Sequence, residues 1–284
     1  TSEKERHMSE RVIGIQLGPQ TVFDEGPQRV LDNVQLAGVN ALFVYSHTYY
    51  GAHGRRPEAF ADDHGVPVKD ERERILTRCW VTPHEQYYGG TFLRHVKNPG
   101  DEYGDRDVFE TLAAPASERS VKLYARILEP IKGTIAAQIA NWSKILARDI
   151  FGNVTDLPSF DHPDYVNFLA STVEDLFRSY PLAGFMLGCE RVGPLSRLLF
   201  RGEPPADFSA SGLAAATAAG IDVGRAREGW LRLYNLVKEI ETGSIPTDGA
   251  FIAVLRTLFQ YPEIIAWDRR EYEAMQAFSR AVGS

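Results

Sequence analysis

Short apolar runs alternate with amphipathic segments along this sequence, and this alternation limits the possible folds more than any other feature. An apolar run at Val12–Leu17 ends on a Gly-Pro turn, and the segment from Gly26 to Ala37 carries its apolar residues at helical spacing. A second apolar run, Ala41–Tyr45, follows. A strand, a helix and a strand in so short a stretch predict a right-handed βαβ unit with parallel strands.

Two further apolar runs continue this pattern. Lys122–Leu128 is predicted to be a third strand, and Phe185–Cys189 is too short for a helix and is predicted to be a buried fourth strand. A helix from about Pro163 to Tyr180 leads into the fourth strand, with Asp161 as its cap. After the fourth strand the sequence indicates only helices, at about Leu213–Ala219, Val223–Thr242, Asp248–Tyr261 and Trp267–Val282.

These elements predict an α/β fold of the (β/α) TIM-barrel type that is incomplete. A closed barrel of eight strands typically takes ~250 residues, and here about four parallel strands and their connections occupy most of a chain of 284 residues. The prediction includes a long insertion after the second strand and a helical carboxyl-terminal part. We expect residues 1–10 to form a disordered or cloning-derived tail and residues 11–284 to form a single barrel-type domain.

The insertion spans residues 52–117, where glycine, proline, histidine, aspartate and arginine are common and apolar periods are short. Loops of this length in a compact domain are usually functional or mobile. Trp80, His84 and Tyr87–Gly90 lie within it. Aromatic residues above the carboxyl end of a strand suit a sugar-like ligand, whose apolar ring faces stack on them. Alternatively, these aromatic residues form a small core of the insertion itself.

Charge and composition exclude several classes of function. A net charge of -7 and the lack of a basic run argue against nucleic acid as a partner, because the phosphate backbone requires a basic surface. No apolar stretch reaches the ~20 residues of a membrane-spanning helix, and the polar amino terminus lacks the core of a signal peptide. Cys79 and Cys189 are too few for a disulfide framework. We therefore expect a cytoplasmic protein, or one whose export signal has been removed.

Carboxylates follow two of the predicted strands. Glu190 and Arg191 come directly after the fourth strand, and Glu129 follows the third. Because the carboxyl ends of parallel strands carry the chemistry of barrels and open sheets, Glu190 is the first catalytic candidate and Glu129 the second. The two glutamates could share a proton and perform acid and base catalysis, or they could form a structural pair. Glu190 could equally pair with Arg191 and brace the following loop.

Polar and aromatic residues near strand ends are candidates for substrate binding. His47 comes after the second strand and could bind either a sugar hydroxyl or a backbone carbonyl. Tyr49 and Tyr50 offer a stacking face and a hydroxyl. The full set of substrate-binding candidates is Gln16, His47, Tyr49, Tyr50, Arg126, Asp149 and Arg191.

Metal and cofactor chemistry has little support in the sequence. His47, His53, Glu129 and Glu190 could converge, but no His-x-x-x-His or Cys-x-x-Cys spacing is present. Glycine-rich nucleotide loops and the Gly-x-Ser-x-Gly elbow are absent as well. We expect neither a metal nor a cofactor.

Several motifs carry a resemblance to a known family. They are Leu17–Pro19, Ser46–Gly51, Asp161–Tyr165, Gly188–Leu195 and Pro246–Trp267. In these motifs the chain resembles the first half of uncharacterised TIM-barrel proteins of the glycoside hydrolase superfamily. The resemblance implies a sugar-binding groove at the carboxyl face of the barrel and an acid/base glutamate at the end of the fourth strand, which Glu190 matches. The second carboxylate of such enzymes lies near the end of a seventh strand, which we expect this chain to lack.

Three hypotheses of function remain open. The leading one is a glycoside hydrolase or other carbohydrate-active enzyme with Glu190 as its acid/base. The second is a non-catalytic sugar-binding or assembly protein, a half-barrel that needs a partner chain. The third is a metal-dependent lyase or isomerase on the same fold. In each hypothesis, the unpaired backbone groups at the edges of the first and fourth strands must be covered. We therefore expect helices of this chain, a second copy of it in a homo-oligomer, or a complementary chain at these edges. The expected substrate is a carbohydrate.

Overall fold

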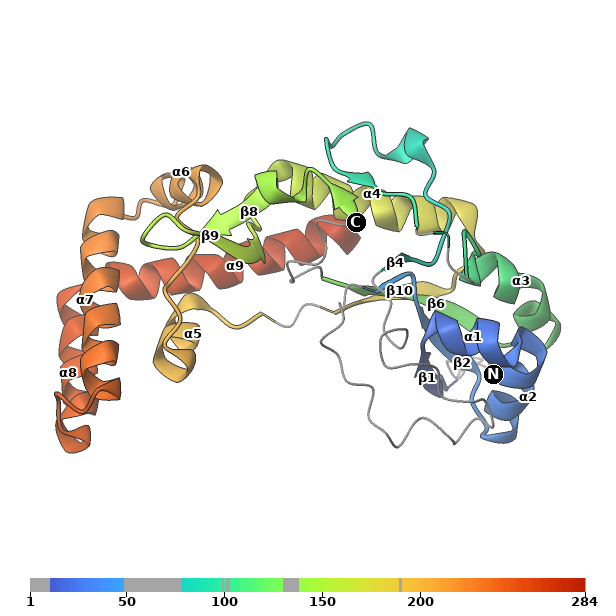
Figure 1. The fold of residues 1–284 in the computed structure, drawn as a ribbon, viewed down its shortest axis with the longest axis horizontal. Coiled ribbons are helices and arrows are strands. Elements are labelled where there is room, and N and C mark those ends of the chain that lie inside the picture. The colour runs from blue at the N-terminus through green and yellow to red at the C-terminus, as the bar shows by residue number, and fades with distance from the viewer. Residues whose placement is uncertain are drawn as a thin grey trace, which may run out of the picture. The chain divides into compact units, whose positions relative to one another are not determined.

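The computed structural model describes residues 11–48, 78–98, 100, 103–129, 138–188 and 191–283 (Figure 1). The predicted tail at residues 1–10 lies outside the described residues. By its contacts the chain divides into two compact units. The first comprises Thr1–Thr82, Asn98–Leu128 and Leu176–Gly188, and the second comprises Pro83–Lys97, Glu129–Asp175 and Cys189–Ser284.

A parallel sheet forms the centre of the first unit. Its strands are β1 (Gly14–Leu17), β2 (Ala41–Tyr45), β6 (Lys122–Leu128) and β10 (Gly184–Gly188), and they lie in the order β1-β2-β6-β10. Neighbouring strands pair in parallel throughout. The four predicted parallel strands are therefore confirmed, and they lie in the sheet in the order in which they occur in the sequence. Closure into a barrel and the single-domain boundaries stay predictions.

Helices pack on one face of this sheet. The first unit contains α1 (Pro19–Glu25), α2 (Pro27–Leu36) and α3 (Val108–Glu118), and α3 contacts β6 directly. Alternate side chains of the two central strands are buried, namely Leu42, Val44, Leu123, Ala125 and Ile127. The two-residue period of a strand places these side chains on the same face, so they form the core between the sheet and its helices.

The helix α3 corrects the irregular insertion predicted for residues 52–117. The side chain of Asp107 accepts hydrogen bonds from the backbone N–H groups of Phe109 and Glu110, which satisfies two donors that a helix start leaves free. Phe109 and Leu112 are buried on its inner side. Pro115 lies inside the helix, and a proline within a segment usually indicates that no helix runs through it.

The second unit is mainly helical. It contains most of α4 (Pro163–Ser179), and it contains α5 (Pro194–Arg201), α6 (Ala210–Ala218), α7 (Val223–Glu241), α8 (Thr247–Gln260) and α9 (Glu263–Gly283). Short 3-10 helices occupy Glu85–Tyr87 and Trp142–Ile145. Two small antiparallel pairs complete it, β5 (Arg94–His95) with β7 (Ile139–Ala140) and β8 (Leu146–Arg148) with β9 (Val154–Pro158). The predicted helices are confirmed to within a few residues, whereas α5 lies where the sequence indicates only a loop.

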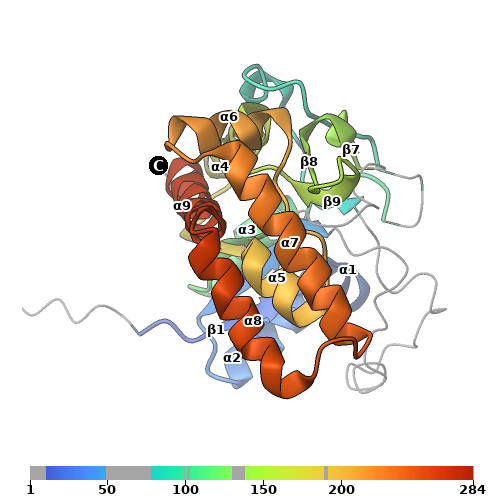
Figure 2. The ribbon, with the colours of Figure 1, turned by 90° about the vertical axis from the view of Figure 1, so that its left-hand side faces the viewer.

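Aromatic side chains dominate the core of the second unit. Trp230 of α7 and Trp267 of α9 are fully buried, together with Leu198 of α5. Phe208 stacks on Trp267 with ring centroids 4.5 Å apart. Figure 2 shows α7 beside α8, and α7 also contacts α9. Because burial of one such side chain contributes roughly 1.5–3 kcal/mol, this core holds α9 firmly in place.

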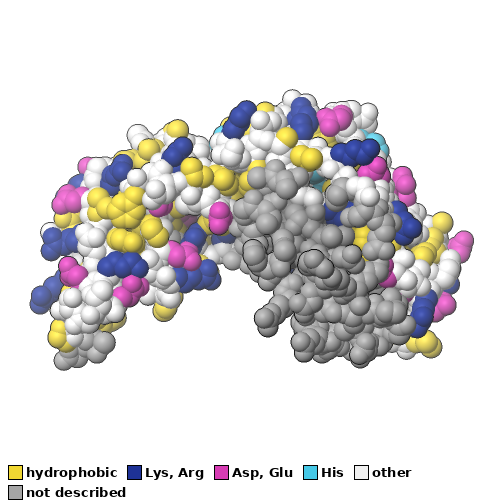
Figure 3. Space-filling view, viewed as in Figure 1, with side chains coloured by type: hydrophobic (Ala, Val, Ile, Leu, Met, Phe, Trp, Pro, Cys, Tyr) yellow, Lys and Arg dark blue, Asp and Glu magenta, His cyan; other side chains and the backbone are white. Residues whose placement is uncertain are grey.

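Charged side chains of both signs are interspersed on the surface drawn in Figure 3. Among the coloured residues of that face, the lysines and arginines form no continuous basic patch. Within the part of the chain that the structure describes, no helix combines the length and the apolarity needed to cross a membrane.

Candidate functional site

One side chain from each strand of the parallel sheet meets on the face away from the buried core residues. We call Gln16 of β1, Tyr45 of β2, Arg126 of β6 and Met186 of β10 the sheet-face site. Tyr45, Arg126 and Met186 are register partners across three neighbouring strands. The Tyr45 hydroxyl donates to Gln16 Oε1 at 3.2 Å, and Gln16 Nε2 lies 3.9 Å from Met186 Sδ. The structure thus brings together two predicted substrate-binding residues, Gln16 and Arg126.

The contact between Gln16 and Met186 indicates that the sheet curves toward this face. β1 and β10 are the outermost strands of the sheet. In a flat sheet they would be three strand spacings, about 14 Å, apart, and side chains stand roughly perpendicular to a sheet. Because the ends of the Gln16 and Met186 side chains meet across three strand spacings, these side chains converge over a concave surface of the sheet. Such a surface is suited to hold a small ligand.

A pair of stacked aromatic rings lies on the same face, one row toward the amino ends of the strands. Phe43 and Tyr124 are half-buried, with ring centroids 4.7 Å apart and an interplanar angle of 19°. Glycines flank them on both outer strands. A Cβ on Gly14 would lie 2.4 Å from the Phe43 ring, and one on Gly184 would lie 2.8 Å from the Tyr124 ring. The glycines therefore make the room in which the two rings lie.

The Arg126 guanidinium lies between an aromatic ring and a glycine. Its Cζ is 5.9 Å from the centroid of the Tyr45 ring. A Cβ on Gly188 would come within 3.0 Å of Arg126 Nη2. Among the described residues, Arg126 Nε is buried without a hydrogen-bond partner. Because a buried donor left unsatisfied is costly, this guanidinium is a candidate ligand-binding group.

His47 follows β2 and is buried by its own neighbours. It belongs to β3 (His47–Thr48), which pairs with β4 (Arg78–Cys79). Its Nδ1 lies 3.0 Å from Ser46 Oγ and its Nε2 lies 3.1 Å from Cys79 Sγ. Both ring nitrogens thus have side-chain partners, and a substrate-binding role for His47 stays a prediction. The pairing of His47 with Cys79 could not be predicted from the sequence, because contact between residues so far apart leaves no local pattern.

The aromatic residues of the predicted insertion are largely buried. Trp80 is fully buried, and its Nε1 donates to Thr48 Oγ1 at 2.8 Å. Its ring packs against Phe23 and Tyr103. Tyr88 is buried as well and packs on Phe168 in the second unit. Trp80 and Tyr88 are therefore core residues, but their ring partners Phe23 and Phe168 lie outside the insertion, so these contacts are not the separate small core predicted as the alternative.

In the second unit, Glu129 and Arg191 form an ion pair. The Tyr165 hydroxyl donates to Glu129 Oε1 at 3.0 Å. Arg191 also donates to the Pro158 carbonyl at 2.6 Å, and its Cζ lies 3.9 Å from the centroid of the Phe160 ring. The Glu129 side chain is only 1% exposed. The carboxylate is therefore fixed in position by a cation and a phenol, and Arg191 has Glu129 as a partner.

The remaining predicted site residues are placed as follows. Asp149 accepts hydrogen bonds from the N–H groups of Phe151 and Asn153 and from Asn153 Nδ2, at 2.8–2.9 Å. These bonds close the turn between β8 and β9, and a substrate-binding role for Asp149 stays a prediction. Glu190, Tyr49 and Tyr50 lie outside the described residues.

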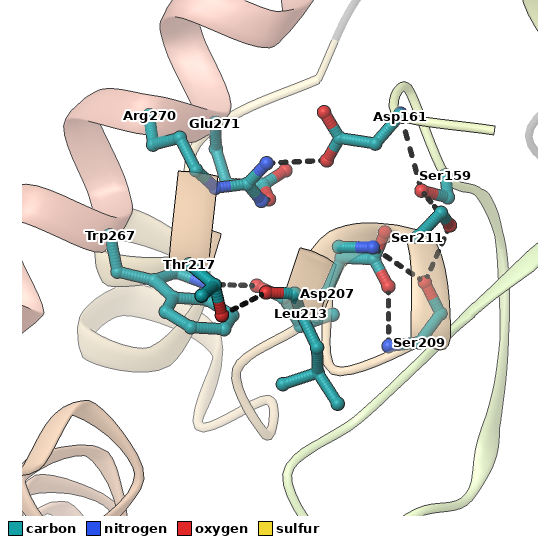
Figure 4. A network of polar contacts seen from close by, with 12 residues as sticks. Ser159, Asp161, Asp207, Ser209, Ser211, Leu213, Thr217, Trp267, Arg270 and Glu271 are labelled. Atoms are coloured by element: carbon teal, nitrogen blue, oxygen red, sulfur yellow. Dashed lines mark hydrogen bonds and ion pairs between the residues drawn. The ribbon is translucent and has the colours of Figure 1, made fainter. Parts of the chain in front are cut away.

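A network of charged side chains occupies the interior of the second unit (Figure 4). Arg270 of α9 pairs with Asp161 and with its neighbour Glu271. Burial raises the pKa of Glu271 to about 8. Arg270 opposes this rise, and the carboxylates of Asp207 and Asp161 add to it. Burial also raises the pKa of Asp161. Glu271 is therefore largely protonated at neutral pH, which is the state of a general acid.

The space beside this network is too small for a sugar. Asp207 Oδ1 accepts from the Ser209 N–H at 2.9 Å, whereas Asp207 Oδ2 is buried and has no hydrogen-bond partner in the part of the chain that the structure describes. Asp207, Glu271, Ser159 and Arg191 help to line a cavity of about 30 Å³. One water molecule needs ~10–15 Å³ of such volume, so the cavity has room for about two waters. The network therefore serves the packing of the second unit, and its cavity cannot hold a sugar ring.

Sequence reasoning did not find this network. Asp161 is predicted only as a helix cap, and Asp207, Arg270 and Glu271 follow no strand. One signal was present, because Arg270 and Glu271 stand three and four positions after Trp267 on α9. Charged residues at that spacing from a buried tryptophan share its inward face.

Comparison with known proteins gives one distant structural match. No protein-family model matches the chain, and no curated protein matches it in sequence. Among solved structures, the noncanonic maltogenic alpha-amylase AmyB from Thermotoga neapolitana matches with a TM-score of 0.39 and 10% sequence identity. The match covers 73% of this chain and 42% of that chain. The chain therefore spans less than half the length of that enzyme.

Proposed function

We propose that this chain is a carbohydrate-active protein of the glycoside hydrolase type, which binds a sugar on the sheet-face site. One observation carries the proposal: side chains from all four parallel strands, half-buried except for the exposed Gln16, gather on one concave face. A sugar offers apolar ring faces to aromatic rings and hydroxyls to polar side chains. Tyr45, Gln16 and Arg126 supply the matching groups, and Phe43 and Tyr124 extend the aromatic surface.

Glu190 is the proposed acid/base. It comes shortly after β10 in the sequence, and the carboxyl ends of parallel strands carry the chemistry of α/β enzymes. Glycoside hydrolysis uses two carboxyl groups, about 5–5.5 Å apart for retention and about 6.5–9.5 Å apart for inversion. Glu129, directly after β6, is the second candidate. Its contacts with Arg191 and Tyr165 would hold a nucleophile in position, and they equally suit a structural ion pair.

A second candidate function is sugar binding without catalysis. The burial of Glu129 favours it, because a carboxylate that is 1% exposed and held by Arg191 is poorly placed to reach a substrate. The four residues of the sheet-face site include no carboxylate. Under this alternative, the chain binds saccharides on the same face and does not hydrolyse them.

The two candidates differ in what Glu190→Gln does. For a hydrolase, we expect Glu190→Gln to abolish turnover on a panel of aryl glycosides while calorimetry shows unchanged saccharide binding and an unchanged melting temperature. Glu273→Gln on the exposed side of α9 is the matched control and should keep full turnover. Wild-type protein that binds saccharides saturably without any turnover would favour the binding protein. Neither binding nor turnover across the panel would contradict the proposal.

A further inference from the structure

The Arg126 side chain brings an unpaired positive charge onto the sheet-face site. A guanidinium stays protonated at every physiological pH, so its charge must be matched by a partner or by water. Among the described residues, no carboxylate forms an ion pair with Arg126, and its Nε is buried without a hydrogen-bond partner. The other members of the site, Gln16, Tyr45 and Met186, are neutral. The site therefore holds a net positive charge in its own residues.

The surroundings of Arg126 leave its donors available for a ligand. The Tyr45 hydroxyl donates to Gln16, so it does not donate toward the guanidinium side. Gly188 offers no side chain, and any Cβ at that position would come within 3.0 Å of Arg126 Nη2. Glycine thus preserves the space that the guanidinium occupies. A guanidinium presents a planar fork of N–H donors, which matches the two oxygens of a carboxylate in a bidentate pair.

We propose that the sugar bound on the sheet-face site is an acidic one of the uronic acid class, and that Arg126 binds its carboxylate. This inference rests on the proposed carbohydrate-binding function. A sulfate ester on a sugar presents oxygens of similar geometry, and the test below separates the two. Phe43 and Tyr124 lie beside the charge on the same face, so one ligand can contact these rings and place its carboxylate on Arg126.

The test is a calorimetric titration of the full chain with hexuronides, the matched neutral hexosides and hexose sulfates. A hydrogen-bonded pair with a charged group corresponds to a preference of about 10- to 100-fold, so hexuronides should bind that much more tightly than neutral hexosides. Arg126→Met should remove the preference, because it should lower the affinity for hexuronides far more than the affinity for neutral hexosides. Arg126→Lys keeps the charge but loses the fork, so it should retain only part of the preference. Arg280→Met, on the exposed surface of α9, is the matched control and should retain all of it.

Three results would overturn this inference. Equal binding of hexuronides and neutral hexosides would contradict it and leave the proposed function standing. Tighter binding of hexose sulfates than of hexuronides would contradict the uronic acid assignment. Failure of every saccharide to bind would contradict the proposed function, and this inference with it. Thermal melting of each variant shows whether it is folded. If Arg126→Met does not fold, the hexuronide preference of Arg126→Lys decides the test.

Discussion

Gln16 Nε2 lies 3.9 Å from Met186 Sδ, although Gln16 stands on β1 and Met186 on β10, the two outer strands of the sheet. The two residues are 170 positions apart in the sequence. Tyr45 and Arg126 lie between them on the central strands, where Tyr45, Arg126 and Met186 are register partners and Gln16 is the register partner of Phe43. Side chains that converge over one face are the arrangement inside a curved parallel sheet. This contact gives the sheet-face site its concave shape.

The glycines that flank the stacked rings should not tolerate a side chain. Gly14→Ala places a Cβ 2.4 Å from the Phe43 ring, and overpacking of this kind costs about 1–3 kcal/mol. We expect urea denaturation to show such a loss in the free energy of unfolding. Gly89→Ala is the matched control, because nothing lies within 4 Å of its added Cβ, and it should change stability by less than about 0.5 kcal/mol. Equal effects of the two variants would show that Phe43 does not lie against Gly14.

Removal of one partner of the buried Glu129–Arg191 pair should be strongly destabilising. Arg191→Met leaves the Glu129 carboxylate buried without its cation, which costs about 3–5 kcal/mol. The double variant Glu129→Gln/Arg191→Met should recover much of that loss, because both charges are gone. Lys238→Met, which breaks the exposed pair with Glu241, should have a far smaller effect in the same chemical denaturation experiment. A double variant no more stable than Arg191→Met would argue against a coupled pair.

Ionisation of Glu271 should weaken the fold as the pH rises. Its pKa is raised from 4.5 to about 8, chiefly by burial. Between these values the folded protein keeps the proton that the unfolded chain releases, so stability falls with increasing pH. The slope from one such group is at most about 1.4 kcal/mol per pH unit. Glu271→Gln mimics the protonated side chain, and we expect its stability relative to wild type to increase from pH 5 to pH 8. Parallel pH profiles of the two proteins would contradict this assignment.

His95 should give the stability of the fold the opposite dependence on pH. Burial lowers its pKa from 6.5 to about 4, and the charge of Asp175 opposes this effect only in part. The folded protein therefore holds a neutral imidazole that protonates in the unfolded chain. Its stability contribution is present above pH 6.5 and is lost as the pH falls toward 4. NMR titration of the ring resonances measures this pKa directly, and a midpoint at or above 6.5 would refute the prediction.

Local patterns in the sequence predicted the sheet well. The run Ala41–Tyr45 and the run Lys122–Leu128 are strands with the predicted bounds, because an apolar strand packed on helices leaves a clear signal. Gln16 and Arg126 were predicted only as substrate-binding candidates, and the structure places them on one face of the sheet. Contacts between distant residues leave no such signal. The pair of His47 with Cys79 and the network around Glu271 therefore became visible only when the chain was folded.

The chain has three methionines, Met8, Met186 and Met275, and they permit a direct test of the claim that a sugar binds on the sheet-face site. With [13C-methyl]methionine-labelled protein, a saccharide that binds there should shift the Met186 methyl signal saturably, because Met186 belongs to the site. The signal of Met275, on α9 of the second unit, should not move and serves as the internal control. A saccharide that binds by calorimetry but leaves the Met186 signal unchanged would contradict the account.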